Sequence, residues 1–108
     1  MKELHLLIVT HHASEDEVDK CIPGHRAYLE KFHARGVFVA SGPSVPRELG
    51  GAIIATGVSR AELDDIIAED EFVRQGVSSY RVVTINVRRQ HPAMEALLEQ
   101  LAGAEASP

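Results

Sequence analysis

The sequence predicts an α+β fold in which strands and helices follow one another in the order βαββαβ, with one more helix at the C-terminus. Three observations lead to this prediction. Short apolar runs alternate with segments of helical periodicity, two Ser-x-x-Glu boxes mark helix starts, and glycine- and proline-rich turns separate the segments. The chain of 108 residues is long enough for one globular domain. We expect this domain over residues 1–102, with a flexible tail at 103–108.

The first strand and the first helix have clear signals. Leu4–Thr10 is short and apolar, as expected of a strand. Ser14 begins a Ser-x-x-Glu box, and a helical pattern continues from there to Arg35. Pro23 and the glycine after it interrupt this pattern, because an internal proline removes a hydrogen-bond donor and clashes with the preceding turn. We therefore expect either a kink at Pro23 or a new helix that starts there.

The later segments are predicted from the same periodicity and turn signals. In chain order they are a strand at Val37–Ala40, a turn-rich loop at Ser41–Gly51, a strand at Ala52–Thr56, a helix from Ser59 to about Glu69, a connection at Phe72–Gly76, a strand at Tyr80–Val87 and a helix from Pro92. Two helical crossovers between short strands indicate a ferredoxin-like arrangement with an antiparallel four-stranded sheet.

The predicted strands are apolar on both faces. In the first strand, Leu6 and Ile8 alternate with Leu7 and Val9. A sheet with one wet face would show cleaner polar alternation, and two helices can cover only one face. We therefore expect a homodimer that buries sheet against sheet. The alternative is that the C-terminal helix folds over the second face or docks on the partner.

Composition argues against several classes of function. The net charge is −5 and no basic surface alternates with aromatic residues, so we expect no nucleic-acid partner. No apolar run approaches the ~20 residues that span a bilayer, so we expect no membrane partner. The single cysteine, Cys21, excludes an internal disulfide and favours the cytoplasm. No glycine-rich phosphate motif is present, and we expect the protein to work without a cofactor.

Two ionisable residues interrupt apolar helical stripes. The first stripe is Val18, Ile22, His25, Leu29 and Phe32, and the second is Leu63, Ile66, Ile67 and Asp70. Burying an ionisable group costs free energy unless it has a partner, and a carboxylate can accept the ring N–H of a histidine. His25 and Asp70 are therefore the candidates for a catalytic pair. Two other interpretations stay open: a packed histidine bonded to a backbone carbonyl, and an aspartate that caps a loop.

Other polar residues are weaker candidates. His11 and His12 are adjacent at the exit of the first strand, so their side chains point apart and at most one faces the pocket. Without a helical His-x-x-x-His pair or a cysteine cluster, we expect no metal. Ser41 has no Gly-x-Ser-x-Gly elbow around it, so it is a better candidate for a ligand contact or a local backbone bond than for a nucleophile. His33 is expected to face solvent.

Short motifs occur in a distinctive order over about Met1 to Val87. They are His25-x-x-Tyr28-Leu29, Gly36, Ser41-Gly42-Pro43, Gly50-Gly51 and Asp70-x-Phe72. In this order and spacing the chain resembles the YCII-related domain family. The resemblance implies a dimeric ferredoxin-like fold of the dimeric α+β barrel group, with His25 and Asp70 as catalytic residues and Ser41 as a pocket residue. Some relatives carry out lyase- or dehydrochlorinase-type steps in the breakdown of aromatic compounds.

The chain departs from the family pattern at two positions. Ile22 stands where the family often has arginine, which argues against binding an anionic substrate in the family's way. Glu71 stands where proline often follows the aspartate.

These observations support one main hypothesis of function. The protein is expected to be a lyase- or isomerase-type enzyme that binds a small organic compound, such as an aromatic or carbonyl compound. His25 would move a proton as general base, Asp70 would orient it, and Ser41 and His11 would bind the substrate. The reaction would be a cofactor-independent elimination or isomerisation. The alternatives are a non-catalytic protein that binds a small metabolite in the same pocket, and a structural domain in which the pair is a buried contact.

Overall fold

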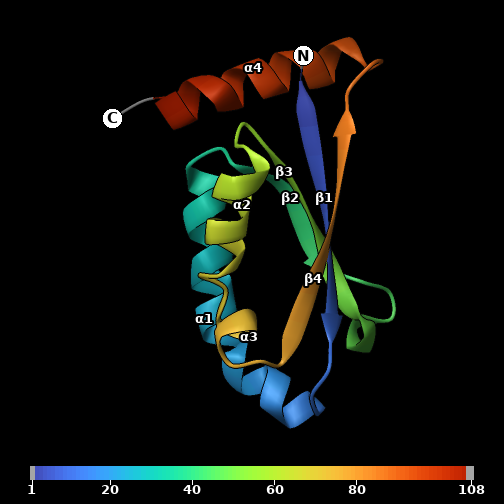
Figure 1. Cartoon of the computed structure of the whole chain (residues 1–108), viewed down its shortest axis with the longest axis vertical. Coiled ribbons are helices and arrows are strands. Elements are labelled where there is room, and N and C mark those ends of the chain that lie inside the picture. The colour runs from blue at the N-terminus through green and yellow to red at the C-terminus, as the bar shows by residue number, and fades with distance from the viewer. Residues whose placement is uncertain (1, 107–108) are drawn as a thin grey trace.

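The computed structural model describes the backbone of residues 2–106 and the side chains of residues 2–103. A four-stranded sheet carries helices on one face (Figure 1). The elements are β1 (Glu3–His11), α1 (Glu15–Ala34), β2 (Phe38–Pro43), the 3-10 turn η1 (Arg47–Leu49), β3 (Gly50–Thr56), α2 (Arg60–Ile67), α3 (Glu71–Arg74), β4 (Ser78–Asn86) and α4 (Pro92–Ala106). The strands lie in the order β2-β3-β1-β4, and each neighbouring pair is antiparallel. The predicted ferredoxin-like α+β fold is confirmed.

Helix α1 is continuous through Pro23, so the prediction of a new helix starting there is wrong. Figure 1 shows the blue first part of α1 inclined to its teal remainder, which corresponds to the alternative of a kink. Val18, before the proline, and Phe32, after it, are both buried. Because both halves of the helix pack on the core, their burial outweighs the loss of one helical hydrogen bond.

Three other segments differ from the sequence-based expectation. Strand β2 continues through Ser41 to Pro43, where a loop was expected. A proline is tolerated there because β2 is an edge strand, whose outer N–H groups have no partner strand. A short helix, α3, replaces the expected connection. Helix α4 reaches Ala106 and so enters the segment expected to be a flexible tail, in which alanine and glutamate favour helix; residues 107–108 lie outside the described part.

The glycine pair at the start of β3 permits close contact between strands. Gly50 has a φ of 135°, and a Cβ atom there would lie 1.8 Å from the carbonyl oxygen of Val9. A Cβ atom on Gly51 would lie 2.6 Å from the carbonyl oxygen of Gly42. Only residues without a side chain fit at these positions. Both glycines line the cavity described below.

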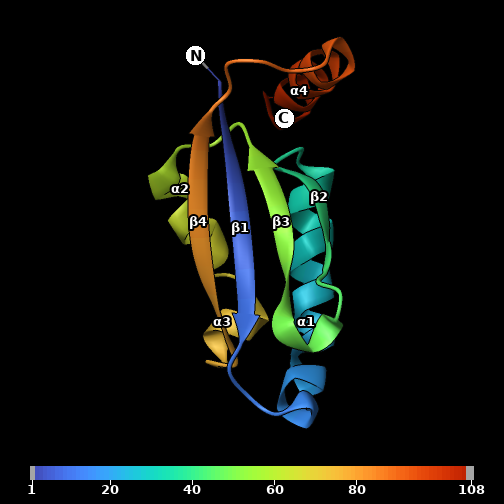
Figure 2. The ribbon, with the colours of Figure 1, turned by 90° about the vertical axis from the view of Figure 1, so that its right-hand side faces the viewer.

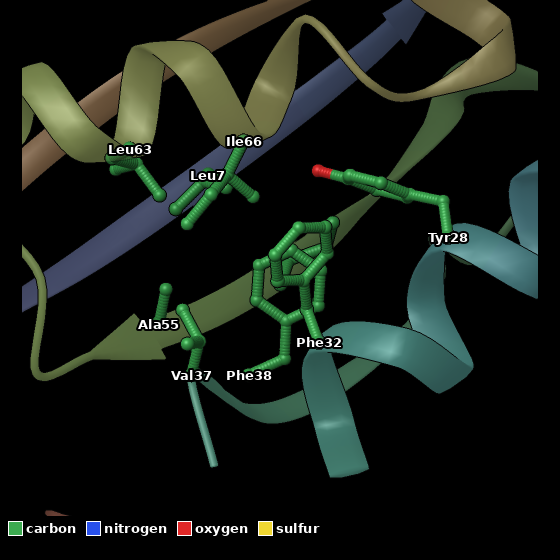
Figure 3. Packing of buried hydrophobic residues seen from close by; sticks show 9 residues of the cluster. Leu7, Tyr28, Phe32, Val37, Phe38, Ala55, Leu63 and Ile66 are labelled. Atoms are coloured by element: carbon green, nitrogen blue, oxygen red, sulfur yellow. The ribbon is translucent and has the colours of Figure 1, made fainter. Parts of the chain in front are cut away.

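The core lies between the sheet and the helices (Figure 3). Phe32 and Phe38 are at its centre, and the hydroxyl of Tyr28 points away from α1. A second buried cluster lies around Phe72. Tyr80 of β4 packs against both clusters, so it occupies the boundary between them. This boundary is where the polar residues discussed below meet.

Within residues 2–106, no helix lies on the opposite face of the sheet (Figure 2). Its exposed apolar residues include Ile8, Val83 and Ile85, with exposed fractions of 36%, 38% and 42%. Helix α4 lies across one end of the sheet instead, where Leu98 is buried. The alternative that the C-terminal helix folds over this face is therefore wrong. None of the helices in the described range is long and apolar enough to cross a membrane.

Candidate active site

His25 and Asp70 are in direct contact although 45 positions separate them in the chain. The Nδ1 atom of His25 lies 2.8 Å from Oδ1 of Asp70. The Asp70 side chain is completely buried, and the His25 side chain is 17% exposed. The carboxylate accepts the ring N–H, so the contact fixes which nitrogen of His25 carries the proton. In the neutral form of this ring, the other nitrogen, Nε2, has a free lone pair.

Local features of α1 and α3 explain why these residues meet. A Cβ atom on Gly24 would lie 2.8 Å from Cβ of Glu71, so glycine allows α1 and α3 to approach closely next to His25. Asp70 also caps α3, because its Oδ1 atom accepts the backbone N–H of Phe72 at 3.1 Å. The interpretation of Asp70 as a capping residue is therefore compatible with its contact to His25.

A tyrosine holds the other oxygen of this carboxylate. The Tyr80 hydroxyl donates to Oδ2 of Asp70 at 2.6 Å, and the Tyr28 hydroxyl lies 3.3 Å from that of Tyr80. Burial raises the pKa of Tyr28 and of Tyr80 well above the usual range of phenols, so both groups keep their protons. Sequence analysis missed Tyr80, although an inward-facing tyrosine in an apolar strand is a signal, since a buried hydroxyl needs a partner.

His25 lines a cavity. The ring stacks on Phe72 with centroids 4.0 Å apart and planes 11° apart. Among the residues that the structure describes, none bonds to Nε2 of His25. The cavity has a volume of about 810 Å³. Its apolar lining comes from α1, β1, β3 and α3, and includes Val9, Val18, Ile22, Leu29, Ile53 and Phe72.

His11 and Ser41 line the same cavity as His25. The His11 ring contacts Phe72 edge-on at 5.2 Å, and its Nδ1 lies 2.7 Å from the Ser78 hydroxyl. Burial and the nearby His25 lower the pKa of His11 from 6.5, so its ring is neutral near pH 7. Asp70 does not line the cavity, because it lies behind His25.

Two further histidines, His12 and His33, each contact a serine hydroxyl. His12 bonds to Ser79 and is absent from the cavity lining, in agreement with the expected divergence of adjacent side chains. The Nε2 atom of His33 lies 2.8 Å from the Ser41 hydroxyl, and His33 is half-buried. The expectation that His33 faces solvent holds only in part, because β2 continues far enough to bring the exposed Ser41 beside α1.

The cavity rim carries charges of both signs. Arg47 pairs with Glu15 at 3.1 Å and lies 4.0 Å from Asp19. Arg26 also lines the cavity, one residue after His25. Within the described range, no group of three or more histidine, cysteine, aspartate or glutamate side chains is arranged to hold a metal ion. The arrangement combines an apolar cavity with one imidazole that a buried carboxylate orients, which is suited to moving a proton.

Comparison with known proteins identifies the family and the fold. The 5-chloro-2-hydroxyhydroquinone dehydrochlorinase from Burkholderia phenoliruptrix AC1100, solved in complex with 2,5-dihydroxybenzoquinone, is 18% identical and has a TM-score of 0.63. The match covers 81% of this chain and 95% of that chain, and shows a shared fold. A cofactor-independent oxygenase from Streptomyces nogalater is 14% identical, with a TM-score of 0.48 and coverage of 84% and 97%.

The curated proteins contain no match to this chain. The model of the YCII-related domain family matches residues 3–86, which include all four strands and both residues of the His25–Asp70 contact. Because this match spans most of the sequence, the chain belongs to the YCII-related domain family.

Proposed function

We propose that this protein is an enzyme that catalyses elimination or isomerisation of a small organic compound without a cofactor. One observation carries the proposal: His25 faces an 810 Å³ cavity with one ring nitrogen bonded to the buried Asp70 and the other without a bond to any described residue. Ligand cavities of roughly 300–1,000 Å³ commonly hold small molecules, so the volume suits such a substrate.

The proposed reaction begins with proton transfer to His25. Its Nε2 atom takes a proton from a carbon or hydroxyl of the substrate, and the electron pair of the broken bond remains on the substrate. In an elimination this pair forms a double bond as the leaving group departs; in an isomerisation the proton returns to another atom. Asp70 stabilises the imidazolium that forms, and His11 and Ser41 bind polar groups of the substrate.

The lining of the cavity and the ligand of the similar solved structure support one class of substrate. Apolar side chains and two aromatic rings, those of Phe72 and His25, favour a flat organic molecule. The dehydrochlorinase with the same fold was solved with a dihydroxybenzoquinone. We therefore propose hydroxylated or chlorinated aromatic compounds and their quinone or carbonyl relatives as substrates.

Deuterium exchange and product release test this proposal. Candidate compounds are incubated with the protein in D2O, and NMR records deuterium incorporation while an electrode records chloride release. Exchange or elimination is expected with at least one member of the class, and His25→Asn should reduce the rate about 100-fold or more. The asparagine amide can still donate to Asp70, which separates loss of the base from loss of the contact.

The same experiment distinguishes the alternative of a binding protein. Saturable binding of these compounds to the cavity, with no exchange and no product, would contradict the enzyme and favour a protein that binds a small metabolite. Equal rates for His25→Asn and the unaltered protein would remove His25 from the proposed role.

The exposed apolar sheet face supports a homodimer. Leu4, Leu6 and Ile54 accompany Ile8, Val83 and Ile85 on this face, judged from the alternation and register of β1, β3 and β4. A second copy of the chain presents the same apolar surface, so the two can match about a two-fold axis. Val83→Lys should convert a dimer to a monomer in sedimentation analysis. Val45→Lys, at a 99% exposed position away from the sheet, is the matched control.

The cytoplasm is the proposed location of the protein. Cys21 is free and buried, which is compatible with a reducing compartment. Fractionation of cells that express a tagged chain tests this placement, and recovery from an oxidising compartment would contradict it.

A further inference from the structure

Two tyrosines lie behind Asp70, on the side away from the cavity. We propose that Tyr80 is a positioning residue for His25, because its hydroxyl holds the Asp70 carboxylate in its ionised and oriented state, with Tyr28 supporting Tyr80. The effect on turnover rests on the proposed function. The effect on the His25 ring does not, and it is measurable without any substrate.

The hydrogen bonds of Asp70 show why Tyr80 matters. Oδ1 accepts from the His25 ring and from the backbone of Phe72, whereas Oδ2 accepts from Tyr80 at 2.6 Å. Within the described part of the chain, Tyr80 is the only donor to Oδ2. Asp70 has no exposed surface, so water does not replace a missing donor. A buried carboxylate stays ionised only with such donors.

The two hydroxyls form a directed chain toward Asp70. Tyr80 has one hydroxyl proton, and the short contact shows that it goes to the carboxylate. The Tyr28 hydroxyl must then donate to the oxygen of Tyr80, at 3.3 Å. Hydrogen bonds that point the same way strengthen one another. The chain ends in the core, where Tyr28 is 5% exposed and contacts Phe32 and Phe38, so it stabilises charge and does not deliver protons from solvent.

Loss of the Tyr80 hydroxyl has a defined electrostatic consequence. Oδ2 would have no donor, so the coupled His25–Asp70 pair would bind a proton more readily. His25 would then be protonated, and unable to act as a base, over a wider range of pH. The titratable and charged groups near the pair include His11 on β1, Cys21, Arg26 and Tyr28 on α1, Tyr80 on β4, Glu69 after α2 and Glu71 on α3. The substitution Tyr80→Phe removes the Tyr80 hydroxyl and leaves the other groups of this set in place.

The test is an NMR titration of the histidine rings in the ligand-free protein. In Tyr80→Phe the titration midpoint of His25 should move to higher pH, and in Tyr28→Phe it should move in the same direction by less. Thr84→Val is the matched control. It removes a hydroxyl that bonds the buried His5 on the same face of β4, and the His25 midpoint should stay unchanged. With a turned-over substrate, Tyr80→Phe should lose about 10-fold in rate on the acidic side and recover at higher pH.

Each outcome bears on the proposal. A folded Tyr80→Phe protein in which His25 titrates as in the unaltered protein would overturn it, and so would an equal shift in Thr84→Val. If Tyr80→Phe does not fold, Tyr28→Phe decides by the presence or absence of the smaller shift. A shift of the His25 midpoint in a protein that turns over no compound would support this inference while contradicting the proposed enzyme.

Discussion

His5 and His25 are both enclosed by the fold, but their ring nitrogens are used differently. His5 has no exposed surface; its Nδ1 lies 2.7 Å from the Thr84 hydroxyl and its Nε2 lies 2.8 Å from the carbonyl oxygen of Val58. His25 lines the cavity and uses one nitrogen for Asp70, whereas no described residue bonds to the other. A histidine with both nitrogens bonded serves the structure, whereas a spare nitrogen beside a cavity is available for chemistry.

The largest expected difference in stability comes from replacing each of these two histidines by asparagine. His5→Asn leaves the buried carbonyl of Val58 without its donor and should lower the free energy of unfolding by about 2–3 kcal/mol. His25→Asn keeps a donor for Asp70 and should cost under about 1 kcal/mol. Urea unfolding measures both values. Equal losses would mean that the His25–Asp70 contact is as structural as the bonds of His5.

The close approach of α1 and α3 gives the second prediction. Replacing glycine by alanine inside a helix ordinarily stabilises it by up to about 1 kcal/mol. At Gly24 the new Cβ would lie 2.8 Å from Cβ of Glu71, which is not the movable end of that side chain. Gly24→Ala should therefore destabilise the protein by about 1–2 kcal/mol and perturb the His25 ring signals in NMR, with the His5 signals unchanged. A stabilised variant would contradict the stated role of Gly24.

The smallest expected effect is on the pH dependence of stability and comes from His11, because this residue is only partly buried. Its pKa in the folded protein lies below 6.5, so the unfolded chain binds a proton first as the pH falls. The stability that neutral His11 contributes above pH 6.5 is therefore lost as the pH drops through that value. The urea midpoint should fall less between pH 8 and pH 5 in His11→Gln than in the unaltered protein. An equally steep fall in the variant would assign the pH dependence to other groups.

The sequence predicted those features of the fold and site that depend on residues close together in the chain. Serine caps and periodic apolar residues located α1, α2 and α4 but not the short α3, and a polar residue inside an apolar stripe singled out His25 and Asp70. Tyr80 was missed because a tyrosine in an apolar strand looks like a core residue until the position of β4 beside Asp70 is known. Pro23 was misjudged in part, since the rule against internal proline is local whereas the burial of both halves of α1 depends on the whole fold.

The separation of His25 from its partners along the chain has a consequence for folding. His25 lies on the helix between β1 and β2, whereas Asp70 and Tyr80 come after β3. A chain that has formed only its N-terminal half possesses the imidazole without the groups that orient it. Incompletely folded molecules therefore lack the assembled centre, and recovery of its function during refolding would report that the last long-range contacts have formed.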